Sequence, residues 1–100
     1  MKKVNNFNRL VSQKVYKKCV DAGYTKYSEI CVLLDTGDSF VKAVFSEYRK
    51  KLNLYHLVRL SYELKCSISD FIPTMGDYLA VYPDGQSEYE YFLMSMEEEE

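Results

Sequence analysis

Apolar residues recur at helical spacing through the first part of the chain. Between about Asn5 and Ala22 they fall at i, i+3, i+4, i+8 and i+12, which places them on one face of a helix. These residues are Phe7, Leu10, Val11, Val15 and Cys19. Gly23 follows at the position where a left-handed residue commonly ends a helix. The pattern therefore predicts an amphipathic first helix.

Two further helices are predicted on either side of the turn cluster "DTGDS" at residues 35–39. The segment at about 26–34 follows a possible N-cap at Thr25 and has apolar residues on one side. The segment at about 39–50 has apolar residues at i, i+3, i+4 and i+7, which are expected to face a core. These four residues are Val41, Val44, Phe45 and Tyr48.

Cap residues mark a fourth and a fifth helix. Asn53 is expected to cap a helix at about 54–65, in which Leu57, Leu60, Ser61 and Leu64 repeat at helical spacing. Ser67, with Asp70 three residues later, is expected to cap a short helix that contains Ile68, Phe71 and Ile72. Pro73 should stop that helix, because proline cannot continue it.

The last quarter of the chain has a different pattern. "DYLAVY" and "SEYEYFLM" are rich in Tyr, Val and Phe, and "PDGQ" lies between them. In the second segment apolar and acidic residues alternate with a period of two, which is typical of a strand. We therefore predict a β-hairpin over residues 74–94, followed by a disordered acidic tail over residues 95–100.

Composition limits the class of protein. The chain has 100 residues and 47% of them are hydrophobic, which is enough for one domain with a packed core. It has no apolar run of membrane-spanning length and no apolar segment of a secretory signal, so we expect a cytoplasmic protein that does not enter a membrane.

Candidate chemistry is sparse. Three separated cysteines and one histidine give no recognisable metal spacing, and no nucleophile elbow or phosphate-binding glycine loop is present. We expect no catalytic residue, no metal and no cofactor, so an enzyme is not predicted.

The net charge of −2 hides an uneven distribution. Residues 1–72 hold all 13 Lys and Arg residues against 7 acids, and residues 73–100 hold the other 8 acids. The mildly basic first part permits nucleic-acid binding, although it is less basic than many nucleic-acid-binding domains.

The segment "NLYHLVRLSYELKCSISDFI" resembles the fourth and fifth helices of the lambda-repressor-like helix-turn-helix family, of Cro or xenobiotic-response-element type. That family has a capped helix with the pattern Leu-x-x-Leu-Ala-x-x-Leu, a short link, and an acidic residue before a final Leu or Phe. "EICVLLDTGDSFVKAV" is similar to its second and third helices, and the resemblance covers roughly residues 7–73. The chain departs from the family at the turn glycine, which aligns with Asp35, and at the usual Gln, which aligns with Tyr27. The Glu-x-Gly that closes the third helix is replaced by "SEYRKK".

The resemblance implies a mainly α fold, with a five-helix helix-turn-helix body at residues 1–73 and the hairpin appended to it. It also implies that the start of the third helix reads double-stranded DNA while basic residues around it hold phosphates. The expected DNA-binding residues are Lys26, Tyr27, Ser39, Phe40, Lys42, Ser46, Arg49, Lys50 and Lys51. Arg49, Lys50 and Lys51 have a second interpretation, as the cationic end of a helix that complements its dipole.

The favoured function is a small, sequence-specific transcriptional regulator of phage or mobile-element type, dimeric through its hairpin. The expected dimer interface consists of Tyr78, Leu79, Val81, Tyr89, Tyr91 and Phe92. The hairpin has an alternative role, as a cover for the helices of its own chain. The alternative function is a protein-binding module on the same scaffold, such as an anti-CRISPR-like phage inhibitor of a host defence nuclease. That module would use the acidic tail or the aromatic side chains of Tyr27 and Phe40.

Overall fold

The structure is a computed structural model that describes the backbone of residues 3–98 and the side chains of residues 3–94. Within that part of the chain, all regular structure is helical, with six α-helices and one short 3-10 helix. The elements are α1 (Asn6–Asp21), α2 (Tyr27–Leu34), α3 (Asp38–Phe45), α4 (Leu54–Glu63), η1 (Ile68–Phe71), α5 (Met75–Val81) and α6 (Gln86–Glu98).

Polar caps begin several of these helices. The side chain of Asn53 accepts a hydrogen bond from the His56 N–H at 2.9 Å, and the His56 Nδ1 accepts one in return from the Asn53 N–H. Ser67 and Asp70 form the same reciprocal arrangement at η1. Such caps satisfy amides that have no partner inside the helix. The caps predicted at Asn53 and Ser67 are confirmed, whereas the N-cap of α2 is Lys26 and not Thr25.

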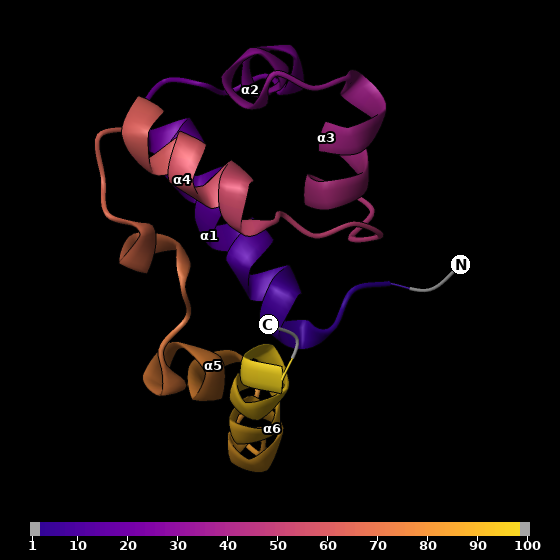
Figure 1. The fold of residues 1–100 in the computed structure, drawn as a ribbon, viewed down its shortest axis with the longest axis vertical. Helices are drawn as coiled ribbons and strands as arrows, with labels where there is room; N and C mark the ends of the chain where they lie inside the picture. Colours follow the sequence, from indigo (N-terminus) through magenta and orange to yellow (C-terminus); the bar gives the residue numbers. More distant parts are fainter. Residues whose placement is uncertain (1–2, 99–100) are drawn as a thin grey trace.

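The long helix α1 runs through the middle of the fold, with α2, α3 and α4 around one end and α5 and α6 at the other (Figure 1). Its predicted apolar face is buried from Phe7 to Cys19. Leu57 and Leu60 of α4 face the same core, as does Phe71 of η1, which is fully buried. The apolar periodicity therefore identified the core face of each helix up to η1.

The third helix is shorter than predicted. It ends at Phe45, so residues 46–51 form a loop and do not continue the helix to residue 50. Tyr48 has a left-handed φ of 54° and is half-buried, and its carbonyl accepts a hydrogen bond from the Val4 N–H at 2.8 Å. The Arg49 N–H donates to the Ala43 carbonyl and closes the turn. The N-terminal segment thus lies against the loop that replaces the last predicted turn of this helix.

The predicted C-terminal β-hairpin is wrong, and with it the five-helix count. Residues 75–81 and 86–98 are helices, and the described chain contains no strand. Thr74 and Asp77 cap α5 reciprocally, and the linker between the two helices contains the Pro-Asp-Gly sequence that was assigned to a hairpin turn. The aromatic residues that suggested strands belong instead to the helical spacings of Tyr78 with Tyr82 and Tyr89 with Phe92.

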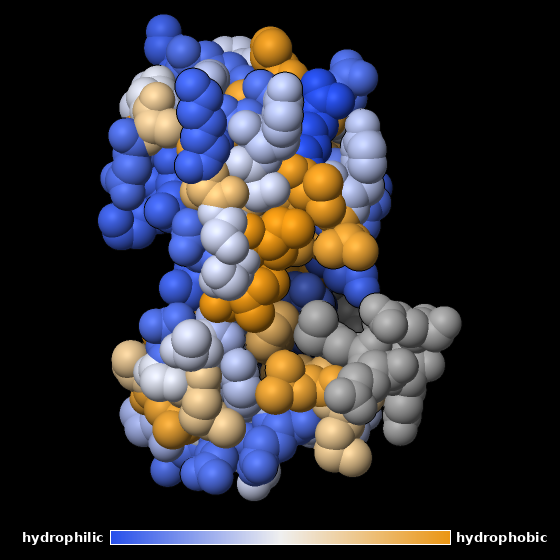
Figure 2. Space-filling view, turned by 60° about the vertical axis from the view of Figure 1, so that its left-hand side comes forward, coloured by the Kyte–Doolittle hydropathy of each residue, from blue (hydrophilic) through white to orange (hydrophobic). Residues whose placement is uncertain are grey.

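The last helix extends into the segment expected to be a disordered tail. The backbone of residues 95–98 belongs to α6, and residues 99–100 of the expected acidic tail lie outside the described residues. Figure 2 shows apolar residues gathered down the middle of the side that α4, η1 and α5 share. None of the helices described is long and apolar enough to cross a membrane.

Candidate nucleic-acid interface

A left-handed turn joins α2 to α3. Asp35 has φ 52° and ψ 52°, and its N–H and that of Thr36 donate to carbonyls at the end of α2. Aspartate is among the few residues other than glycine that adopt this conformation at low cost. Asp35 is also the position at which the resembled family has its turn glycine. Asp35 therefore ends α2 in a left-handed conformation without a glycine.

The first turn of α3 is largely exposed to solvent. Ser39 and Lys42 are exposed, as predicted for residues that would meet DNA. Asp38 is exposed as well and lies 3.9 Å from the Cys31 thiol of α2. Burial, followed by the nearby Asp38 carboxylate, raises the pKa of the Cys31 thiol. Phe40 is half-buried, and the centre of its ring lies 5.1 Å from the centre of the His56 ring. It therefore forms part of the α3–α4 contact.

The start of α2 offers one exposed cation. Lys26 is the exposed N-cap residue, whereas Tyr27 is half-buried and packs edge-on against Tyr16. The Glu29 carboxylate accepts hydrogen bonds from the Thr25 and Lys26 N–H groups. An acidic group therefore already occupies part of the position where a phosphate would meet this helix N-terminus.

The remaining predicted DNA-binding residues lie in the loop after α3. Ser46 is the exposed C-cap residue of α3, and Lys50 and Lys51 are also exposed. Arg49 is half-buried, and its Nε donates to the Glu47 carboxylate at 2.8 Å. Because Glu47 neutralises Arg49 inside the loop, Lys50 is better placed than Arg49 to meet a phosphate.

The structure places further basic residues beside the loop after α3, which the sequence pattern did not reveal. The hydrogen bond from Val4 to Tyr48 holds the extended N-terminal segment against the loop after α3. Exposed Lys3 is next to Val4, and the guanidinium of Arg9 lies 4.5 Å from the centre of the Tyr48 ring. Lys3 was visible in the sequence, but nothing in the periodicity predicted where it would lie.

The residues expected to form a dimer interface are divided between the core and the surface. Tyr78 is fully buried and donates a hydrogen bond to the Glu88 carboxylate. Tyr89 is 7% exposed and donates to the Pro73 carbonyl at 2.8 Å, and half-buried Phe92 packs on Phe7. Leu79 is half-buried, whereas Val81 and Tyr91 are exposed. The segment therefore covers α1 of its own chain and is not a hairpin, and its expected role in a dimer stays a prediction.

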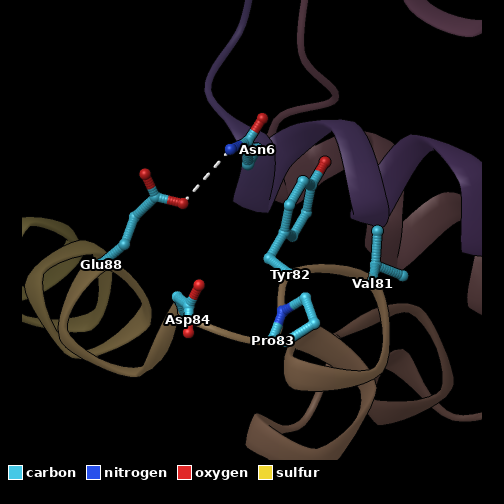
Figure 3. A pocket seen from close by; sticks show the side chains of 7 residues that line it. Asn6, Val81, Tyr82, Pro83, Asp84 and Glu88 are labelled. Carbon is cyan, nitrogen blue, oxygen red and sulfur yellow. Dashed lines mark hydrogen bonds between the residues drawn. The ribbon is translucent and has the colours of Figure 1, made fainter.

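A shallow hollow lies between the first turn of α1 and the α5–α6 linker (Figure 3). The Asn6 side-chain amide donates to the Glu88 carboxylate across it at 3.2 Å. Its other lining residues include Tyr82, Pro83 and Asp84. Among the residues that the structure describes, no group of three His, Cys, Asp or Glu side chains could hold a metal ion.

Comparison with known proteins gives no relative. No protein-family model, no curated protein and no solved structure matches the chain. The functional interpretation therefore depends on the geometry of the chain itself.

Proposed function

We propose that this protein binds double-stranded DNA as a small transcriptional regulator, with α3 as the recognition helix. The observation that supports this best is the left-handed turn at Asp35, which joins α2 to an α3 whose first turn is exposed. In helix-turn-helix proteins this arrangement lets the second helix enter the major groove. The proposal includes a phage or mobile-element origin and a cytoplasmic location.

The described side chains suggest roles in binding. Ser39 and Lys42 on α3 would contact base edges or phosphates, since both are exposed. Lys26 and Lys50 would contact the DNA backbone on either side of α3, and Lys3 would extend the contact beyond the loop. Because most of these residues are lysines, electrostatic attraction should supply much of the affinity.

The test is a titration of the purified protein with random duplex DNA, and then with duplexes enriched by selection, at two salt concentrations. A regulator gives binding that weakens as salt increases, together with an enriched motif. The double variant Lys42→Glu with Lys50→Glu should reduce the affinity at least tenfold, and should lower the slope of log affinity against log salt by about 2.

The matched control carries the same charge change outside the α2–α3 region, as Lys17→Glu with Lys65→Glu. Both of these lysines are exposed, and the exposed ion pair of Lys17 with Asp21 contributes little to stability. The control should remain folded and bind DNA more tightly than the Lys42→Glu with Lys50→Glu variant. The absence of wild-type binding at low salt would refute the DNA proposal and leave the protein-binding alternative.

A further inference from the structure

His56 has two contacts that depend on its protonation state. Its Nδ1 accepts a hydrogen bond from the Asn53 N–H at 3.2 Å, and only a ring nitrogen without a proton can accept one. Its ring also lies against Phe40, with the two ring centres 5.1 Å apart. Because α3 packs mainly on α1 and α2, this ring pair is a contact that joins α3 to α4. One half-buried side chain, the single histidine of the chain, therefore both caps α4 and contacts α3.

Protonation of His56 removes the cap. The charged ring carries a proton on both nitrogens, so Nδ1 becomes a donor that faces the Asn53 N–H, which is also a donor. His56 is the third residue of α4, in the first turn, where the helix dipole disfavours a positive charge. The charged form therefore loses a hydrogen bond, leaves an amide at the helix start without this partner, and lies in an unfavourable field.

The contact with Phe40 offsets only part of this loss. A cation is attracted when it lies over the face of an aromatic ring, but these two rings are tilted by 39° and His56 is half-buried. Burial lowers the pKa of His56, which means that its surroundings favour the neutral form. The charged ring is therefore expected to turn toward water, away from Phe40 and Asn53.

Charged groups on the surrounding elements do not reverse this preference. Tyr55 is the titratable group whose ring contacts His56, with the ring centres 6.1 Å apart. The charged residues of α3 and α4, and those next to α4 in the preceding loop, are Asp38, Lys42, Lys50, Lys51, Arg59 and Glu63. Burial, and not one of these charges, accounts for the lowered pKa of His56.

We propose that His56 is a pH-sensitive switch between α3 and α4. At neutral pH the uncharged ring caps α4 and packs on Phe40. As the pH falls, the protonated ring gives up both contacts, so the start of α4 loosens and the first turn of α3 loses its support. Because Phe40 follows the exposed Ser39, the position of that turn becomes dependent on pH. The switch is a property of the free chain, so its test requires no DNA.

The effect on stability has a definite sign. In the folded chain the pKa of His56 lies below its ordinary value of 6.5, so the unfolded chain binds the proton more tightly. The contribution of His56 to stability is therefore complete above pH 6.5 and is lost as the pH falls through the folded pKa. Within that window the equilibrium constant for unfolding should rise by up to about tenfold per pH unit.

The first experiment is an NMR titration of the full chain between about pH 8 and pH 5, the range in which histidine titrates. The ring signals of His56 should titrate with a midpoint below 6.5. The nuclear Overhauser effect between the rings of His56 and Phe40 should be present at the high end of the range and lost at the low end. A midpoint at or above 6.5, or a ring contact that persists after His56 is protonated, would overturn the proposal.

The matched variant is His56→Gln, because glutamine at the third helical position can return the same hydrogen bond to the N-cap amide and does not titrate. Urea unfolding of both proteins over the same pH range should show the rise in the unfolding constant for the wild type and not for His56→Gln. His56→Ala lacks the cap at every pH, so it should unfold more readily than the wild type at pH 8 and should also lack the rise. An equal pH dependence of the wild type and His56→Gln would refute the switch.

Discussion

Gly85 lies against a buried tyrosine at the start of α6, and one added carbon should destabilise the fold. A Cβ at position 85 would lie 2.6 Å from Cε1 of Tyr78 and 3.0 Å from the Tyr82 carbonyl oxygen. Tyr78 cannot easily move away, because its hydroxyl is bonded to Glu88 and its ring packs on Tyr89 and Phe92. Gly85→Ala therefore forces a shift of backbone or of a fixed ring.

Overpacking of this kind typically costs 1–3 kcal/mol, and the fixed position of Tyr78 points to about 2–3 kcal/mol here. For a domain of this size that loss lowers the melting temperature by roughly 10–20 °C. Urea unfolding followed by far-UV circular dichroism measures the change, and the dependence on denaturant should keep its slope. The matched control is Gly76→Ala in α5, where the nearest heavy atom to an added Cβ is Thr74 Oγ1 at 3.7 Å. It should cost nothing and gain up to about 1 kcal/mol of helix propensity.

A third variant tests whether Gly85 is needed because of its contact with Tyr78 or because of a left-handed turn conformation. If residue 85 were the left-handed residue of a hairpin turn, Gly85→Asn would be tolerated better than Gly85→Ala, since asparagine adopts that conformation. In the helical arrangement asparagine is larger and should be at least as harmful as alanine. A Gly85→Ala protein as stable as the wild type would show that Tyr78 does not pack beside Gly85, and the packing of α5 on α6 would then be incorrect.

Two further predictions concern the turn and the tyrosine. Asp35→Gly should raise the free energy of unfolding by up to about 1 kcal/mol, because glycine adopts the φ of 52° without a Cβ penalty, and a variant with lower stability would contradict the left-handed turn. Burial, with the hydrogen bond to Glu88, holds the pKa of Tyr78 above its ordinary value near 10, so its contribution to stability is complete below pH 10 and decreases at higher pH. The free energy of unfolding, measured with urea, should therefore fall more between pH 9.5 and 11 for the wild type than for Tyr78→Phe, with a difference of up to about 1.4 kcal/mol per pH unit, and parallel curves would argue against this contact.

The sequence predicted the helices whose signals are local. The caps at Asn53 and Ser67 and the apolar face from Phe7 to Cys19 were all visible as short-range patterns, and each is present. The end of α3 was not predictable in this way. The Val4 N–H that bonds the Tyr48 carbonyl comes from the other end of the sequence, and no periodicity describes such a contact.

The C-terminal helices were missed because two signals conflicted. Tyr and Val favour strands, and the alternation around Tyr89 and Tyr91 has a period of two. The capping pair Thr74 and Asp77 and the spacing from Tyr89 to Phe92 indicated helices in the same segment. Packing on α1 decided between them, since Tyr89 and Phe92 both contact Phe7. The local preference of these residues for a strand contributes less free energy than the burial of two aromatic side chains.

The contact between α1 and α6 also affects how the protein is made. Asn6 and Glu88 are 82 positions apart in sequence and share a hydrogen bond, and Phe7 is covered by aromatic residues of the same late helix. At about 5–20 residues per second, a ribosome needs roughly 4–16 s to synthesise the cover after it has made Phe7. During that interval the apolar start of α1 is available to chaperones and to other nascent chains. A messenger RNA truncated before the α6 codons would release a polypeptide with this apolar surface exposed. Such a polypeptide would be a good substrate for cellular quality control.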